Sequence, residues 1–224
     1  MKLGKRAVLA IAGTLLCVAL AGAQGSYKVT SGSAPAAVPA PLQAVLESQS
    51  EQFTTPQGAP VCEIWWRKGI PAQKSAGGSP DVLYGGLSMG ELIGVINFPA
   101  ATKDFRGQNI KPGYYTLRYA LIPQDGNHMG VSAYRDFLLL VPVTDDPNPS
   151  ENMSFEDVVK ASRLATGTGH PGVLMLDPPS QAVTAAFPGA FQDDQGNWAL
   201  EVKLSTAGGQ PLPFAMVLEG QYQG

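Results

Sequence analysis

Cysteine and histidine are scarce in this chain, and their scarcity limits the chemistry that it can carry. The 224 residues include 2 cysteines and 2 histidines, and charged residues make up only 15%. Cys17 lies in an apolar N-terminal run, so Cys62 would have no partner for an internal disulfide once that run is removed. The fold therefore depends on a hydrophobic core, which about 200 residues can supply in a single domain.

The sequence also lacks an apolar run long enough for a membrane span. The longest, Ala7 to Leu20, has about 14 residues, whereas a spanning helix needs roughly 20. Basic residues precede this run and Ala21-Gly22-Ala23 follows it, which is the pattern of a secretory signal peptide. We expect residues 1–23 to be cleaved off and the protein to be exported, to the periplasm or beyond the cell, without a transmembrane segment.

Positive charge is limited too, with 15 Lys and Arg against 18 Asp and Glu. The expected signal peptide holds three basic residues and no acid, so the mature chain would carry a net charge of 12 − 18 = −6. An acidic protein is not attracted to nucleic acid or to an anionic membrane surface, so neither is expected as a partner.

Glycine and proline are plentiful, with 26 and 19 residues, and they divide the chain into short segments. Residues 24–41 are rich in Pro, Ala and Ser, which predicts a flexible linker ahead of one β-rich domain at 42–224. The clearest strand is Tyr114 to Ile122, where residues that favour β structure point alternately to opposite faces. Asp136 to Val143 is almost continuously apolar, which is typical of a strand buried on both faces.

The clearest helix runs from Ser154 to Ala165, with Ser154 and Asp157 as a capping pair and Gly167 as its stop. Six to eight strands without regularly alternating helices argue against a parallel α/β sheet. The sequence predicts a mainly β fold, an antiparallel β-sandwich with one or two short helices. A β-barrel is the alternative.

Adjacent aromatic residues suggest a ligand-binding face. Trp65 and Trp66 lie in the strand-like run 61–67, so one faces the core and the other faces outward. Tyr114 and Tyr115 are also adjacent, so one of them faces the core and the other faces outward. Tyr134 adds a further aromatic ring. Outward rings on neighbouring strands would form a platform for a sugar ring or an apolar ligand. Alternatively, the N-terminal segment or the Ser154 helix covers these faces.

The metal-binding candidates are Asp125, Asn127, His128 and His170. The run 125–130 resembles a calcium loop, but Met129 replaces an oxygen ligand and no helix flanks it. A transition-metal site could draw on His128, His170, Met129 and Cys62, yet the two histidines do not share a metal-binding spacing. Asp, Asn and Gly are also ordinary turn residues. No cofactor is therefore expected, with calcium or a transition metal as the alternative.

Signals for catalysis are weak. Cys62 lies inside an apolar strand and is expected to be a buried hydrophobic residue rather than a nucleophile. A Gly-x-Ser-x-Gly motif is absent. The acids Glu63, Glu91, Asp104 and Asp136 contain no pair that spacing selects for glycoside hydrolysis. The sequence thus favours a protein that is not an enzyme.

Three phrases resemble a group of secreted bacterial proteins of unknown function that carries no family name. They are V-C-E-I-W-W-R-K at 61–68, D-F-R-G-Q-N-I-K-P-G-Y-Y-T-L-R-Y at 104–119, and G-N-H-M-G-V-S-A-Y-R-D-F-L-L-L-V-P at 126–142. The resemblance covers about 61–203 and implies an exported domain without carrying over any catalytic residue.

Three functional hypotheses follow. The first is an exported, non-enzymatic β domain that binds a glycan, an envelope component or a protein through its aromatic face. The second is a small periplasmic metal-binding protein that uses the 125–129 loop, with His170. The third, an envelope hydrolase, requires a cluster of acids or a Cys-His pair that the sequence does not display.

Overall fold

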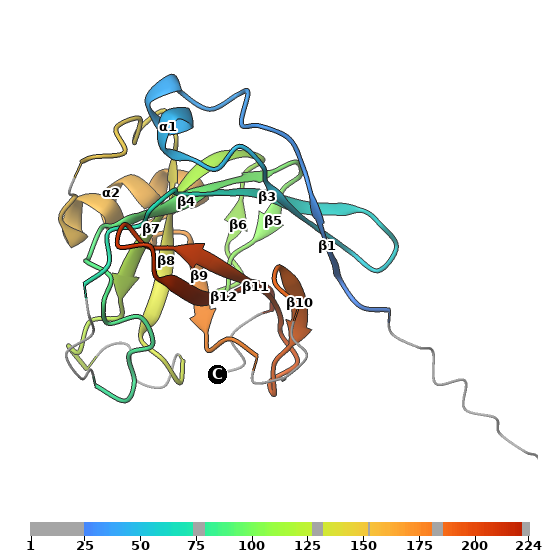
Figure 1. Ribbon diagram of the computed structural model, residues 1–224. Helices are drawn as coiled ribbons and strands as arrows, with labels where there is room; N and C mark the ends of the chain where they lie inside the picture. The colour runs from blue at the N-terminus through green and yellow to red at the C-terminus, as the bar shows by residue number, and fades with distance from the viewer. Residues whose placement is uncertain (1–24, 74–78, 127–131, 152, 181–185, 221–224) are drawn as a thin grey trace, which may run out of the picture.

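The computed structural model describes residues 25–73, 79–126, 132–151, 153–180 and 186–220 (Figure 1). Its helices are α1 (Ala40–Val45) and α2 (Phe155–Thr166). The main sheet contains ten strands, in the spatial order β1 (Lys28–Ser31), β2 (Glu51–Thr54), β3 (Pro60–Trp66), β4 (Leu92–Phe98), β7 (Gly113–Leu121), β8 (Asp136–Pro142), β9 (Val173–Asp177), β12 (Pro211–Glu219), β11 (Trp198–Ser205) and β10 (Gly189–Gln192). The short strands β5 (Thr102–Lys103) and β6 (Asn109–Ile110) form a separate pair.

Neighbouring strands of the main sheet are antiparallel throughout, and the sheet coils until it is nearly closed into a barrel. The two edge strands, β1 and β10, lie beside each other. The predicted mainly β, antiparallel fold with short helices is confirmed. Of the two predicted arrangements, the chain adopts the barrel, because one continuous ladder of hydrogen bonds joins strands that a sandwich would divide between two sheets.

Side chains that alternate along the strands fill the barrel. In β7, Tyr115, Leu117 and Tyr119 face inward and are almost completely buried. The hydroxyl of Tyr84 closes one end of the interior, donating to the carbonyl of Asp177 at 2.8 Å and accepting from the amide of Ala215 at 2.9 Å. The interior is therefore a packed core rather than a ligand cavity.

Helix α2 lies over the outer face of β8, as Figure 1 shows. Strand β8 is consequently buried on both faces, with Leu138 and Leu140 inside the barrel and Leu139 under the helix, which confirms the prediction. The helix begins after Ser154, whose hydroxyl oxygen accepts from the amide of Asp157 at 3.2 Å, and ends at Gly167 with a φ of 68°. Both predicted ends are confirmed.

A buried ion pair lies on the outer face of β7. The Arg118 guanidinium contacts both carboxylate oxygens of Asp146, with Nε–Oδ2 at 2.7 Å and Nη2–Oδ1 at 2.6 Å. Both side chains are at most 1% exposed. The remaining guanidinium hydrogens bond to the carbonyls of Gly90, Asn148 and Glu151. This network ties the loop after β8 to the sheet.

The described part of the Pro/Ala/Ser-rich segment, residues 25–41, lies along the sheet, although the sequence predicted a flexible linker at 24–41. It contains β1, which pairs with β2 from Lys28 to Ser31. Val38 is buried with Leu42 of α1 against the outer face of β3 and β4. In the described part of the chain, neither helix is long and apolar enough to cross a membrane.

Candidate functional site

The incomplete closure of the barrel leaves a seam between its first and last strands. At one end of the seam, Tyr27 stacks on Phe53 with ring centroids 5.0 Å apart and contacts Trp198 at 5.1 Å. At the other end, Ile70 donates its amide to the carbonyl of Ser205 at 2.8 Å and accepts from Ala207 at 2.9 Å. Strand β10 covers the edge of β11 only at 198–201, so the edge at 202–205 borders an opening.

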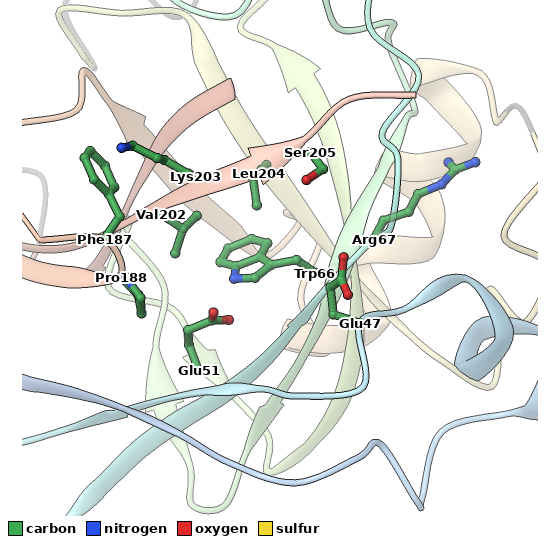
Figure 2. A pocket seen from close by; sticks show the side chains of 10 residues that line it. All are labelled: Glu47, Glu51, Trp66, Arg67, Phe187, Pro188, Val202, Lys203, Leu204 and Ser205. Carbon is green, nitrogen blue, oxygen red and sulfur yellow. The ribbon is translucent and has the colours of Figure 1, made fainter. Parts of the chain in front are cut away.

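A pocket of about 320 Å³ occupies this opening, and we call it the seam pocket (Figure 2). One wall comes from β2, from β3 and from the segment before β2. The other wall comes from β11 and from the chain entering β10. The lining residues are Glu47, Glu51, Trp66, Arg67, Phe187, Pro188, Val202, Lys203, Leu204 and Ser205.

Two buried polar atoms in the seam pocket lack a hydrogen-bond partner, namely Oε2 of Glu51 and Nε1 of Trp66. Trp66 is only 4% exposed. Figure 2 shows the indole nitrogen and the carboxyl of Glu51 pointing toward each other across the pocket. The indole N–H is near the carboxyl, but the pair does not reach the geometry of a hydrogen bond. The only other such atom among the described residues is Oδ1 of Asp81, far along the chain in another loop.

Burial raises the pKa of Glu51 to about 7. The indole N–H of Trp66 and the backbone amide of Glu51 itself oppose this rise, whereas the negative charge of Glu47 adds to it. A carboxyl with a pKa near neutrality can donate as well as accept a hydrogen bond at physiological pH. Perturbed groups of this kind concentrate at functional sites.

Charged and aromatic side chains surround the mouth of the pocket. The Lys203 ammonium lies 4.7 Å from the ring centroid of Phe187, so it is held over that ring. Arg67 forms an ion pair with Glu91. Figure 2 shows Glu47 beside Trp66 and Arg67, and Phe187 beside Lys203. The seam pocket can therefore offer acceptors, donors and a ring face to one small ligand.

The two tryptophans divide between an inward and an outward face as predicted, but the outward one is covered. Trp65 does face outward, but it is 2% exposed because the N-terminal segment covers it, and its indole donates to the carbonyl of Ser33 at 2.7 Å. Tyr114 stacks on Trp65 with centroids 6.1 Å apart. An exposed platform of Trp65, Trp66 and Tyr114 is therefore not formed, and the covering segment is the physical reason. Trp66 faces inward and reaches the seam pocket.

The remaining candidates lie elsewhere. Tyr134 lines a separate cavity of about 410 Å³ near β9 and β10. Asp125 and His170 both line a third cavity, next to α2. Asn127 and His128 lie outside the described residues. Within the described ranges, no group of three or more His, Cys, Asp or Glu side chains is arranged to hold a metal ion.

The acids considered for catalysis have structural partners. Asp136 accepts from the amides of Leu83 and Tyr84 and from the Tyr119 hydroxyl, the last at 2.6 Å. Asp104 accepts from the amides of Arg106 and Gln108. Cys62 is 2% exposed, as expected of a buried hydrophobic residue.

Sequence reasoning missed Glu51, Phe187 and Lys203. Glu51 begins a strand of four residues that no clear alternation announced. Glu51 lies two positions before the inward-facing Phe53, so the two side chains share a face of the strand. If β2 had been predicted, an acid on the inward face would have marked Glu51 as unusual. The seam joins residues about 150 positions apart in the chain, and no local pattern reports such a meeting.

Comparison with family models, with curated proteins and with solved structures returned no match for this chain. The function is therefore inferred from the site itself.

Proposed function

We propose that this protein is an exported, non-enzymatic binding protein that takes a carbohydrate in the seam pocket. The observation that carries the proposal is the pair of unpartnered buried atoms, Oε2 of Glu51 and Nε1 of Trp66, which border one pocket. More than nine in ten buried polar groups in proteins have a hydrogen-bond partner, so two exceptions in one pocket call for a ligand or water to fill the role.

The chemistry of the lining supports a sugar. Sugar hydroxyls both donate and accept, and the pocket offers a carboxyl acceptor at Glu51 and an indole donor at Trp66. Arg67, Lys203 and Ser205 add donors from both walls. Phe187 and Pro188 present apolar faces against which the C–H side of a sugar ring can pack. The volume of about 320 Å³ suits a single ring or a short glycan end.

The arrangement of the acids supports binding rather than hydrolysis. A glycosidase places its two carboxyl groups on opposite sides of the bond that is cleaved. Glu47 and Glu51 both come from the short stretch of chain that leads into and begins β2, so both belong to the same wall of the pocket. The opposite wall contributes Lys203 and Phe187 and no carboxyl group.

The proposal can be tested by screening the exported protein against a soluble glycan panel, with Trp66 fluorescence and thermal shift as readouts. A glycan at about 100 times its dissociation constant should stabilise the fold by roughly 2.7 kcal/mol. Glu51→Gln keeps the size of the side chain but removes its charge, and it should weaken binding at least tenfold. Trp66→Phe should do the same by removing the N–H donor.

Matched controls are Glu156→Gln, an exposed acid on α2, and Trp198→Phe, a tryptophan outside the pocket. Both should bind the glycan like the unsubstituted protein. The proposal is wrong if no glycan binds, or if a glycan binds equally well to the Glu51→Gln and control variants. Release of a reducing sugar during the assay would show that the protein hydrolyses the glycan, and the proposal of a non-enzymatic binding protein would then be wrong.

A further inference from the structure

A second cavity, which we call the α2 groove, lies between helix α2 and the outer face of the barrel. Its volume is about 540 Å³, larger than that of the seam pocket and within the usual range of small-molecule sites. It is on the outer side of β8 and β9, whereas the seam pocket opens at β2, β3 and β11. The two sites share no lining residue.

The floor of the α2 groove is apolar. Phe137 of β8 and Met175 of β9 belong to the cluster buried between the barrel and the helix. Phe155 and Val159 of α2 pack against the same cluster but are only half-buried. The helix therefore does not cover this part of the sheet completely, and an apolar trough remains open along its side.

The rim of the groove is basic in an otherwise acidic protein. Arg106 and Arg163 both line it, both are exposed, and neither forms an ion pair among the described residues. His170 also lines the rim, and the acid there is Asp125. The other described arginines are engaged, since Arg67, Arg118 and Arg135 each have a carboxylate nearby. Two arginines that form no ion pair among the described residues, beside one apolar trough, are complementary to a ligand with an anionic head.

We propose that the α2 groove binds a free carboxylate amphiphile of the fatty-acid class. Its apolar chain would lie along Phe137, Phe155 and Met175, and its carboxylate would meet Arg106 and Arg163. Guanidinium groups bind carboxylates with two parallel hydrogen bonds, which fixes the orientation of the head at the rim. The trough removes the chain from water, which supplies most of the driving force. This inference does not depend on sugar binding at the seam.

The test is calorimetric titration of the exported protein with sodium decanoate below its micelle concentration. Decyltrimethylammonium, with the same chain and the opposite head charge, is the ligand control. We expect decanoate to bind and the cationic analogue to bind at least tenfold more weakly. Raising the salt concentration should weaken decanoate binding, because the head is held by charge.

The variant Arg106→Gln/Arg163→Gln should weaken decanoate binding at least tenfold. It should leave the stability of the fold unchanged, because both side chains are exposed. Lys160→Gln, an exposed change on the same helix outside the groove, is the matched control and should bind decanoate normally. Val159→Asp, which places an acid in the trough, should abolish decanoate binding while circular dichroism reports an intact fold.

The inference is overturned if decanoate does not bind at millimolar concentration, if the cationic analogue binds as well, or if the arginine variant binds unchanged. Sedimentation with phosphatidylglycerol vesicles in the absence of decanoate binding would assign the groove to a membrane surface and overturn it too. Glu51→Gln should leave decanoate binding intact, so that failure here and failure at the seam pocket are distinguishable.

Discussion

Buried polar groups have hydrogen-bond partners on the outer face of the barrel, whereas two of them lack partners at the seam. On the outer face, Asp146 is fully buried and both of its oxygens are bonded to Arg118. At the seam, Glu51 keeps one oxygen without a partner and has a pKa of about 7 because burial opposes its charge. The two neighbouring tryptophans repeat the contrast, since Trp65 donates to Ser33 and Trp66 lacks a partner.

This difference separates a structural polar group from one that remains available for binding. A buried charge whose partners are complete stabilises one arrangement of the chain, and it has no capacity left for a ligand. A buried group with unused capacity is costly to the fold, and the proposed ligand would use that capacity. The contrast therefore points to the seam as the place where this fold has unused hydrogen-bonding capacity.

The strongest test of the contrast is Asp146→Asn. This change leaves the Arg118 guanidinium buried without its counter-charge, which should cost about 3–5 kcal/mol of unfolding free energy. The melting temperature should fall by roughly 10 °C for a domain of this size. Urea denaturation measures the effect, with the exposed neighbour Asp145→Asn as control. A loss below about 1 kcal/mol would mean that the pair is not structural.

A smaller effect is expected inside the barrel for Tyr84→Phe. The Tyr84 hydroxyl serves the carbonyl of Asp177 and the amide of Ala215, and its removal leaves both backbone groups unpaired. We expect a loss of about 1–3 kcal/mol. Tyr114→Phe is the matched control, because the Tyr114 hydroxyl makes no hydrogen bond to the described residues. Equal losses in the two variants would contradict the assigned role of Tyr84.

At the seam, Glu51→Gln should raise the free energy of unfolding above neutral pH, whereas Asp146→Asn lowers it. The folded pKa of Glu51, about 7, exceeds its ordinary value of 4.5, so the folded state holds the proton more tightly than the unfolded state. The unsubstituted protein therefore loses stability as the pH rises from 4.5 through 7. Allowing for the partial exposure of the carboxyl, this loss is about 1–2 kcal/mol.

Denaturation of the unsubstituted protein and of Glu51→Gln at pH 5 and at pH 8 measures this effect. The variant should be the more stable of the two at pH 8, and the difference between them should shrink at pH 5. Glu63→Gln is a suitable control, because that carboxylate accepts hydrogen bonds from Ser50 and Gln52. If the stability of the unsubstituted protein and of Glu51→Gln depended on pH in the same way, the pKa of Glu51 would not be raised by the fold.

The smallest effect is expected at the mouth of the seam pocket, where Arg67 pairs with Glu91. Their side chains are 16% and 15% exposed, against 1% and 0% for Arg118 and Asp146. Glu91→Gln should therefore cost less than about 1 kcal/mol, and salt should reduce that cost further. Salt should change the effect of Asp146→Asn much less, because solvent ions do not reach the buried pair. A larger loss for Glu91→Gln than for Asp146→Asn would reverse the comparison.

Local patterns predicted the elements but not their closure. Strand β7, the doubly buried β8 and both ends of α2 were predicted because alternation, apolar runs and capping residues act within about ten positions. The choice between sandwich and barrel depends on whether β1 (Lys28–Ser31) and β10 (Gly189–Gln192) meet, and these strands lie far apart in the chain. No local pattern records that meeting, so the barrel remained only an alternative.

The candidate site was predicted in part. Trp66 was selected, but for an exposed ring, whereas the structure presents its indole N–H to a pocket. The sequence predicted that one of Trp65 and Trp66 faces outward without saying which; it is Trp65, and the segment predicted to be a linker covers it. Glu51 was missed because its strand has only four residues. Burial of an outward face depends on what packs over it, and alternation cannot report that.

The sequence by itself determined which side chains share a face, since a strand of L-residues alternates with a period of two and a capped helix begins and ends at its own residues. Tertiary structure alone decided which of those faces meet water. It placed Asp146 beside Arg118 and left Glu51 beside an opening, although both are acids. The reason is that the partners of a buried charge come from other strands and loops, as Arg118 does for Asp146 across 28 positions of chain, and only tertiary packing brings them together.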